Sequence, residues 1–144
     1  MCGISGFFSQ SNMSKERVAK LRDGIRERGS DNFGEVLNFD PHTIQSAFYH
    51  ARLSIIDVGA TSNQPYGKAQ YKQKLVYNGE VYNFRELRDV LISRFNIKFE
   101  TDGDTEVVFE GLRCMGKDFI PMISGEFAFC FYDCNSSSLL LARD

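Results

Sequence analysis

Residues 1–8 read Met-Cys-Gly-Ile-Ser-Gly-Phe-Phe and place a cysteine directly after the initiator methionine. Small and apolar residues alternate from position 3 to position 8, which predicts a short buried strand. Removal of Met1 leaves Cys2 with a thiol and a free α-amine on the same residue. The pKa of an α-amine is about 7.7–8.0, so near neutral pH it can act as the general base for that thiol. The stretch therefore predicts a strand headed by a nucleophile, although Cys2 alone also fits a small buried residue.

Three further cysteines, Cys114, Cys130 and Cys134, give no sign of a disulfide or a metal site. Cys130 and Cys134 lie too far apart along one predicted strand to form a bridge. The sequence has no C-x-x-C pair and only 2 histidines, which argues against zinc. We expect these three cysteines to be reduced and structural, and we expect no metal in this chain.

The overall composition is that of an ordinary globular domain. The chain has 144 residues, of which 42% are hydrophobic and 25% charged, and its net charge is −2. This balance offers no basic surface for nucleic acid or an anionic membrane. No apolar run approaches the roughly 20 residues that span a bilayer, and the N-terminus lacks the pattern of a secretory signal. The sequence predicts one domain over residues 1–144, located in the cytoplasm, without nucleic-acid or membrane partners.

The hydrophobic pattern places strands toward both ends of the chain and helices between them. The first helix is expected to begin at a cap on Ser14 and to stop at Gly29. Asn83 and Glu86 resemble a capping box at the start of the second helix. This order favours an α+β fold in which helices cover sheets. We expect strands at residues 3–8, 34–39, 44–56, 75–77, 126–133 and 139–143, and the later helices at 84–95 and 105–115.

Asn78-Gly79 follows a predicted strand and has two interpretations. Asn-Gly is the strongest short signal for a hairpin turn, but here a helix follows rather than a partner strand. Alternatively, the side-chain amide of Asn78 and the backbone N–H of Gly79 form an oxyanion hole. A preorganised donor of that kind stabilises a transition state by about 2.7–4 kcal/mol.

Two charged positions suggest a site for an α-amino acid. Arg52 lies in an otherwise apolar strand, where it is either a solvated edge charge or a fork that grips a carboxylate. Asp102 and Asp104 precede a helix, where a carboxylate either caps the helix or binds an ammonium group. Arg52, such a carboxylate and Cys2 together favour hydrolysis of an amino-acid amide. These residues alone do not distinguish glutamine from asparagine as the substrate. His50, two residues before Arg52, is interpreted as a polar residue within the strand.

Six motifs follow one another along the chain, at residues 1–7, 28–31, 50–57 with 64–65, 77–83, 101–106 and 125–129. Together and in this order they resemble the class II glutamine amidotransferase domain of glutamine-hydrolysing asparagine synthetases. Ser30 stands where that family usually has proline. The resemblance implies a four-layer α/β/β/α sandwich of the N-terminal-nucleophile hydrolase type. The resemblance covers essentially the whole chain.

The resemblance also implies a role for each candidate residue. A thiolate attacks the glutamine amide, ammonia leaves, and water hydrolyses a γ-glutamyl thioester. The nucleophile is Cys2, and Asn78 and Gly79 form the oxyanion hole. The implied substrate-binding residues are Arg52 for the α-carboxylate, the backbone of Leu53, Ser54, Ile55 and Ile56 for the pocket wall, and Glu80 and Asp102 for the α-ammonium group.

Members of this family continue beyond the position of Asp144 with further strands and an ATP-using synthetase domain. We therefore expect a C-terminally incomplete glutaminase domain that supplies ammonia for ATP-dependent asparagine synthesis from aspartate. No cofactor is expected in this chain, and ATP and Mg²⁺ belong to the synthetase domain. The expected partners are glutamine, that domain in cis and a second copy in a homodimer. The alternatives are an amidotransferase of a surface-polysaccharide pathway and a non-catalytic binding module.

Overall fold

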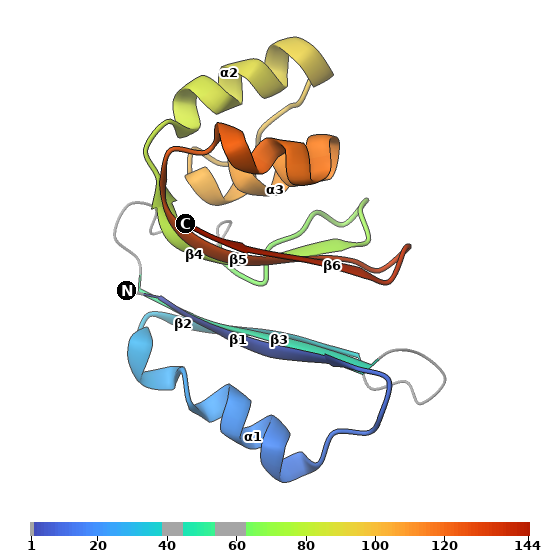
Figure 1. The fold of residues 1–144 in the computed structure, drawn as a ribbon. Coiled ribbons are helices and arrows are strands. Elements are labelled where there is room, and N and C mark those ends of the chain that lie inside the picture. The colour runs from blue at the N-terminus through green and yellow to red at the C-terminus, as the bar shows by residue number, and fades with distance from the viewer. Residues whose placement is uncertain (1, 39–44, 54–62) are drawn as a thin grey trace.

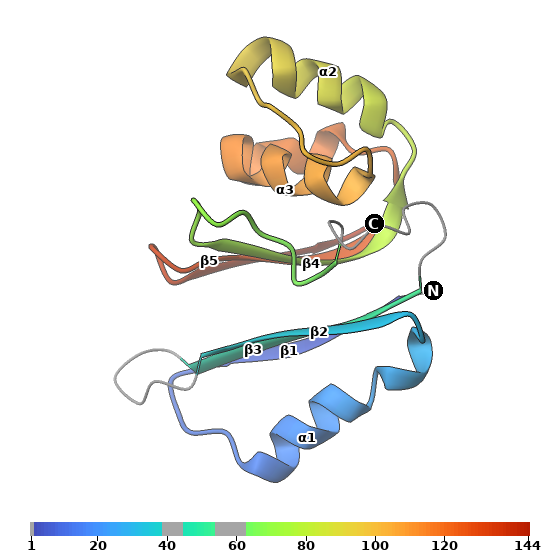
Figure 2. The same ribbon diagram turned by 180° about the vertical axis from the view of Figure 1, so that it is seen from behind.

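Two antiparallel sheets lie face to face in the middle of the molecule, and helices cover their outer faces (Figures 1 and 2). The computed structural model describes residues 2–38, 45–53 and 63–144. The first sheet has the strand order β1-β3-β2 and the second β4-β5-β6. The strands are β1 (Gly3–Ser9), β2 (Asn32–Asn38), β3 (Gln45–Arg52), β4 (Gln73–Val81), β5 (Gly125–Asp133) and β6 (Ser138–Arg143).

The helices complete the expected four layers. The helix α1 (Lys15–Asp23) covers the first sheet, and α2 (Phe84–Phe95) and α3 (Asp104–Met115) cover the second. Short 3-10 helices span Arg26–Arg28 and Gly116–Met122. This arrangement confirms the predicted α+β fold and its α/β/β/α sandwich. No described helix is long and apolar enough to cross a bilayer.

Alternation along β3 decides which side chains reach the space between the sheets. Ala47, Tyr49 and Ala51 pack toward α1, whereas Phe48 joins a cluster between the two sheets. Because side chains alternate along a strand, His50 and Arg52 point to the same side as Phe48. The inter-sheet cluster consists of Phe48, Val76, Cys130 and Tyr132, with Ile4, Phe8 and Leu139 at its border.

Several predicted elements are confirmed and three local predictions are wrong. The strands predicted at 3–8, 126–133 and 139–143 and the helix predicted at 105–115, which ends before Gly116, lie where the pattern predicts. The first helix ends at Asp23, with Gly24 as its C-cap, rather than at Gly29. However, β4 continues through Asn78-Gly79, so the hairpin-turn interpretation is wrong. The side chain of Asn83 makes no capping bond either. It bonds the carbonyl of Met122 and the N–H of Ser124, and so ties the start of α2 to the segment before β5.

All 4 cysteines are free thiols, as expected. Cys130 is buried between the sheets, where burial raises the pKa of its thiol to about 12 and keeps it protonated. Cys134 is exposed in the turn between β5 and β6, so a packing role fits Cys130 but not Cys134.

A buried ionic cluster attaches the segment before β4 to α3. The ammonium of Lys68 lies 2.7 Å from Glu106 and 2.8 Å from Glu110, and Arg113 lies 2.6 Å from Glu110. Burial alone would raise the pKa of the Glu106 carboxyl, but hydrogen bonds from Lys68, Glu100 and Thr101 outweigh burial and hold it below its ordinary value. The Glu106 carboxylate is therefore charged at neutral pH and pairs with the ammonium of Lys68.

Replacing Lys68 with methionine should lower the free energy of unfolding by about 3–5 kcal/mol, because Glu106 would lose its cation in a buried position. Urea denaturation measures this loss. Lys72→Met is the matched control, since Lys72 is exposed and belongs to the same segment. Equal losses in the two variants would contradict a stabilising role for the buried cluster.

Candidate active site

Cys2 lies at the start of β1, against the end of β3. The register pairs Gly3 with Ala51, which places Cys2 beside Arg52. Its Sγ atom lies 3.4 Å from the N–H of Leu53 and 3.5 Å from the carbonyl of the same residue. The predicted strand 44–56 ends at Arg52 within the described residues. The backbone of Leu53 thus contacts the thiol instead of continuing the sheet.

The turn after α1 packs against both Cys2 and the end of β3. Arg28 donates from Nε to the carbonyl of Cys2 at 3.1 Å, and the N–H of Asp31 donates to the carbonyl of Arg52 at 3.0 Å. Gly29 lies so close to the backbone of Arg52 that a Cβ atom would collide with it. Arg28 was not among the predicted site residues, although its motif was part of the resemblance. This turn holds the backbone of Cys2 in place.

A cavity of about 390 Å³ lies beside this turn. Leu53, whose backbone contacts the thiol of Cys2, forms part of its wall. The remaining lining residues are Glu27, Arg28, Gly29 and Ser30. The cavity is widely open to solvent, and the backbone of Leu53 connects its wall to the thiol of Cys2.

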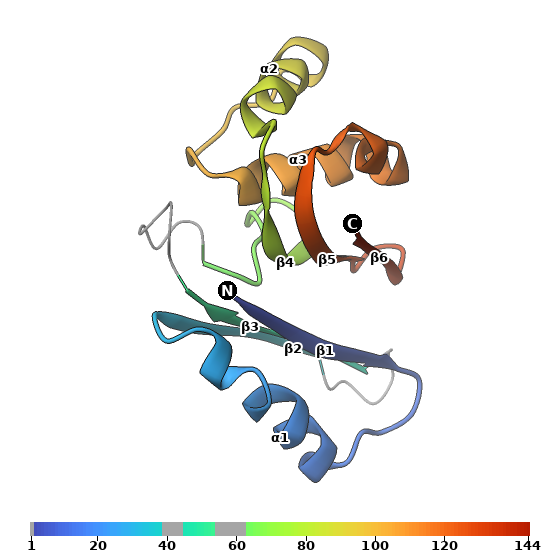
Figure 3. The same cartoon turned by 60° about the vertical axis from the view of Figure 1, so that its left-hand side comes forward.

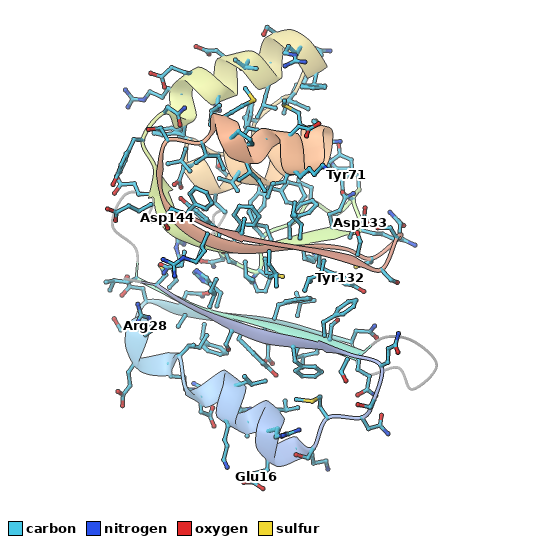
Figure 4. All side chains as sticks on the ribbon, viewed as in Figure 1. Glu16, Arg28, Tyr71, Tyr132, Asp133 and Asp144 are labelled. Carbon is cyan, nitrogen blue, oxygen red and sulfur yellow. The ribbon has the colours of Figure 1, made fainter. Side chains whose placement is uncertain are left out.

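Asn78 enters the same region from the second sheet. It lies two residues after Val76, which belongs to the inter-sheet cluster, so its side chain points toward the first sheet. The strand β4 contacts both β1 and β3. Figures 1 and 3 place the start of β1 beside β4, and Figure 4 shows Arg28 and Asp144 at the same end of the two sheets. Cys2, Arg52 and Asn78 therefore face the same inter-sheet space.

Gly79 directs its backbone polar groups away from the sheet. Its partner on β5 is Phe127, whose N–H and C=O both bond Asp144 on the opposite side of that strand. A pair of this kind shares no ladder hydrogen bond, so the N–H of Gly79 points outward from the edge strand β4. A side chain at this position would collide with the carbonyl of Glu126, which explains the glycine.

Alternate N–H groups of β4 point outward in the same direction, and protein groups occupy three of them. The N–H of Leu75 bonds the carbonyl of Tyr66, that of Tyr77 bonds Oε1 of Gln64 at 2.6 Å, and that of Val81 bonds Oδ2 of Asp104 at 3.0 Å. Among the described residues, no acceptor lies on the Gly79 N–H. Gly79 thus presents a donor at the edge, as an oxyanion hole requires.

Arg52 is buried at the end of β3 on the inter-sheet side. Its Nη1 atom donates to Oδ1 of Asn63 at 2.7 Å. Only 8% of the residue is exposed, so it is not a solvated edge charge. Of the predicted pocket wall, Leu53 contacts Cys2, whereas Ser54, Ile55 and Ile56 lie outside the described residues.

The predicted ammonium-binding carboxylates differ in their surroundings. The side chain of Asp102 is fully exposed and lies 3.8 Å from Arg88. Glu80 is exposed on β4, directly after Gly79. Asp104 lies at the edge of β4, where its Oδ2 atom accepts from the hydroxyl of Tyr77 at 2.6 Å and from Val81. The structure therefore places Asp104, rather than Asp102, against the strand that carries Gly79.

The hydroxyl of Tyr77 is a fixed donor in this arrangement. Burial first, and then the charge of Asp104, raise the pKa of Tyr77 well above its ordinary value. The phenol therefore remains protonated and donates to Asp104. Because Asp104 binds both Tyr77 and Val81, it holds the two ends of the segment that contains Asn78 and Gly79.

His50 is completely buried between the sheets, two residues before Arg52. Among the described residues, neither of its ring nitrogens has a hydrogen-bond partner. Burial lowers the pKa of His50 from 6.5 to about 4; the backbone of Tyr77 opposes this shift, and the charge of Arg52 adds to it to a smaller extent. The imidazole is therefore neutral at pH 7.

This shift predicts a pH dependence of stability. The unfolded chain has the higher His50 pKa, so protonation favours unfolding as the pH falls from about 6.5 to about 4. At about 1.4 kcal/mol per pKa unit, the total loss is roughly 3 kcal/mol. His50→Leu should remove this loss, since an apolar residue leaves no ring nitrogen to protonate. Unfolding free energies between pH 7 and pH 4.5 that fall equally in both proteins would rule out His50 as the cause.

The described part of the chain contains no group of three or more His, Cys, Asp or Glu side chains arranged to hold a metal ion. The polar groups around Cys2 are instead an arginine, an amide side chain and backbone N–H groups. Groups of these kinds are suited to binding a carboxylate and stabilising an oxyanion.

Sequence comparisons agree with this geometry. A protein of Methanocaldococcus jannaschii named putative asparagine synthetase (glutamine-hydrolyzing) 2 is 32% identical over 160 residues, covering 100% of this chain and 30% of that protein. Asparagine synthetase (glutamine-hydrolyzing) 1 of Arabidopsis thaliana is 35% identical over 147 residues, covering 100% of this chain and 24% of that protein. The chain thus spans less than a third of the length of these relatives.

A solved structure supports the fold. Glutamine phosphoribosylpyrophosphate amidotransferase from B. subtilis, solved in complex with ADP and GMP, matches with a TM-score of 0.72 and 18% identity. The match covers 98% of this chain and 37% of that one. The family profile of the glutamine amidotransferase domain matches residues 1–144. The chain belongs to the glutamine amidotransferase domain family.

Proposed function

We propose that this domain hydrolyses glutamine to glutamate and ammonia through a thioester on Cys2. The observation that carries the proposal is the position of Cys2, which places its thiol against Leu53, directly after the buried Arg52. The outward N–H of Gly79 and the inward side chain of Asn78 supply donors for an oxyanion. Membership of the glutamine amidotransferase family supports glutamine, rather than asparagine, as the substrate.

The reaction follows from these groups. After Met1 is removed, the α-amine of Cys2 takes the thiol proton, and the thiolate attacks the amide carbon of glutamine. Asn78 and Gly79 donate to the resulting oxyanion. The C–N bond breaks as the ammonium of Cys2 returns its proton to the leaving nitrogen, which departs as ammonia. The same amine then deprotonates a water that attacks the thioester, releasing glutamate and restoring the thiol.

Substrate recognition uses opposite charges at the two ends of the α-amino acid. Arg52 binds the α-carboxylate, for which its planar guanidinium is suited. For the α-ammonium group we propose Asp104 together with Glu80, because both adjoin the segment that carries Gly79. Asp102 remains a second candidate by resemblance, with an exposed carboxylate beside Arg88.

The choice between the two aspartates has a direct test. Asp104→Asn should raise KM for glutamine about tenfold or more, since it removes a charge that pairs with the substrate ammonium. Asp102→Asn is the matched control, two residues earlier in the chain and with the same change of charge, and should leave KM nearly unchanged. Steady-state ammonia release measures both. A rise in KM confined to Asp102→Asn would return the role to Asp102.

Ammonia and glutamate release from glutamine by the processed chain tests the proposed function as a whole. We expect equal amounts of the two products, and little turnover of asparagine. Calorimetry of the same sample separates the alternatives, because glutamine binding without turnover would indicate a non-catalytic binding module.

We further propose that the ammonia serves an ATP-dependent synthetase domain in cis, in the cytoplasm. The relatives named asparagine synthetase support this, since they are much longer than this chain. The glutaminase reaction above needs no cofactor, and ATP and Mg²⁺ would be used by the synthetase domain. Asparagine formation from aspartate by the longer protein would test this assignment.

A further inference from the structure

Residues 63–68 run along the free edge of β4 and contact both halves of the proposed site. Tyr66 pairs with Leu75 through two backbone hydrogen bonds of 2.7 and 2.9 Å. Lys68 then anchors the segment in the buried cluster with Glu106 and Glu110. The segment is thus held along the outer edge of β4 by a backbone pair and by ion pairs, and its first two residues lie next to the proposed site.

Asn63 and Gln64 reach two different subsites. Asn63 accepts a hydrogen bond from Arg52, the proposed carboxylate-binding group on the first sheet, at 2.7 Å. Gln64 accepts the N–H of Tyr77 on the second sheet, at 2.6 Å. Tyr77 directly precedes Asn78, so neighbouring residues of one segment hold the carboxylate end and the oxyanion end of the site.

Gln64 is itself held firmly. Only 7% of it is exposed. Its backbone carbonyl packs against Gly34 of β2 so closely that a Cβ atom on that glycine would collide with it. Gln64 therefore contacts the first sheet through its backbone and the second sheet through its side chain. A change of this side chain should alter how the two sheets are placed relative to each other at the site.

We infer that Asn63 and Gln64 are positioning residues that set the distance between the carboxylate-binding Arg52 and the oxyanion donors Asn78 and Gly79. The inference rests on the proposed function. That distance must match the length of the substrate side chain, so the pair also contributes to selection of glutamine over asparagine, which is one methylene shorter. Gln64 has a second effect, because it occupies the N–H of Tyr77, whereas no described residue accepts from the N–H of Gly79.

The test compares three variants of the processed chain. Gln64→Met is close in shape but cannot accept from Tyr77, whereas Gln64→Glu keeps an acceptor oxygen. Gln73→Met is the matched control, because Gln73 lies at the far end of β4 and its side chain bonds Asp133 at 3.0 Å. Thermal unfolding of each variant reports the general loss of stability.

We expect Gln64→Met to lower kcat for glutamine about tenfold to a hundredfold, as a misplaced oxyanion donor would. KM should change little, and the preference for glutamine over asparagine should narrow. The γ-aldehyde of glutamate forms a tetrahedral adduct with a thiolate and therefore uses the same oxyanion donors. Its inhibition constant for Gln64→Met should rise by about the same factor by which kcat falls. Gln64→Glu should recover most of the loss, and Gln73→Met should resemble the wild type even if it is equally destabilised.

Amide hydrogen exchange gives a readout that does not depend on activity. Exchange at Tyr77 should become faster in Gln64→Met and stay slow in Gln64→Glu and Gln73→Met. Equal kcat and aldehyde inhibition in the wild type and Gln64→Met would overturn the inference while leaving the proposed function intact. Absence of ammonia release from the wild-type chain would overturn the proposed function, and this inference with it.

Discussion

Replacing Cys2 with alanine should lower ammonia release from glutamine by at least about a thousandfold, because the substitution removes the atom that forms the thioester. Glutamine binding should persist, since Arg52, Asn78 and Gly79 are unchanged. Steady-state ammonia release and calorimetry with glutamine measure the two properties on the same sample. Loss of turnover with retained binding is the expected pair of results.

Cys134→Ala serves as the matched control for this prediction. Cys134 is an exposed free thiol in the turn between β5 and β6, so its removal should leave turnover unchanged. Cys2→Ser should also be nearly inactive, because a hydroxyl is a much weaker acid than a thiol and its attacking anion is scarce. Undiminished ammonia release from Cys2→Ala would reject the assignment of the nucleophile.

A residue left in front of Cys2 should lower turnover by about a hundredfold or more, since it converts the basic α-amine into an amide. A chain with an N-terminal extension that a site-specific protease removes directly before Cys2 allows the comparison within one protein. We expect the uncleaved form to turn glutamine over very slowly. Cleavage should restore activity as the mass of the chain falls by that of the extension.

The control for that experiment is the same protease treatment of a chain whose cleavage site has been altered. Its mass and activity should both stay constant. If the extended and cleaved forms had equal specific activity, the α-amine would not be the base, and the proton would have to go elsewhere. His50 lies two residues before Arg52 in the sequence, but its pKa of about 4 makes it a poor base at pH 7.

The layered fold was predictable because its signals are local or repetitive. Alternation in residues 3–8, a cap at Ser14 and a glycine stop at Gly116 each act within a few residues. The course of β4 through Asn78-Gly79 was not predictable from that window. There the chain stays extended because Gly79 pairs with Phe127, a residue far along the sequence. A nonlocal strand thus overrides a strong turn signal.

The site residues were predictable to a similar degree. Cys2, Arg52 and Asn78 stand out by residue type, and the structure directs them to one inter-sheet space. The choice between Asp102 and Asp104 depends on groups that no short motif contains. Glu106 binds the backbone of Glu100 and Thr101, while Tyr77 and Val81 bind Asp104, so tertiary contacts decide which carboxylate faces β4.

The contact of Gln64 with β4 could not be predicted from the sequence either. It depends on β4 being an edge strand, because only then does the N–H of Tyr77 point outward and need an acceptor such as the Gln64 side chain. Sequence patterns describe which face of a strand is buried, but not which edge of a sheet remains open.

Covalent labelling with a glutamine analogue that carries a chloromethyl ketone in place of the side-chain amide tests the central claim most directly. Peptide mass spectrometry of the processed chain should find one label per chain, on Cys2, and no label on Cys114, Cys130 or the exposed Cys134. Added glutamine should slow the labelling of Cys2. Label on another cysteine, or labelling of Cys2 that glutamine does not slow, would contradict a glutamine site built around the first residue of the mature chain.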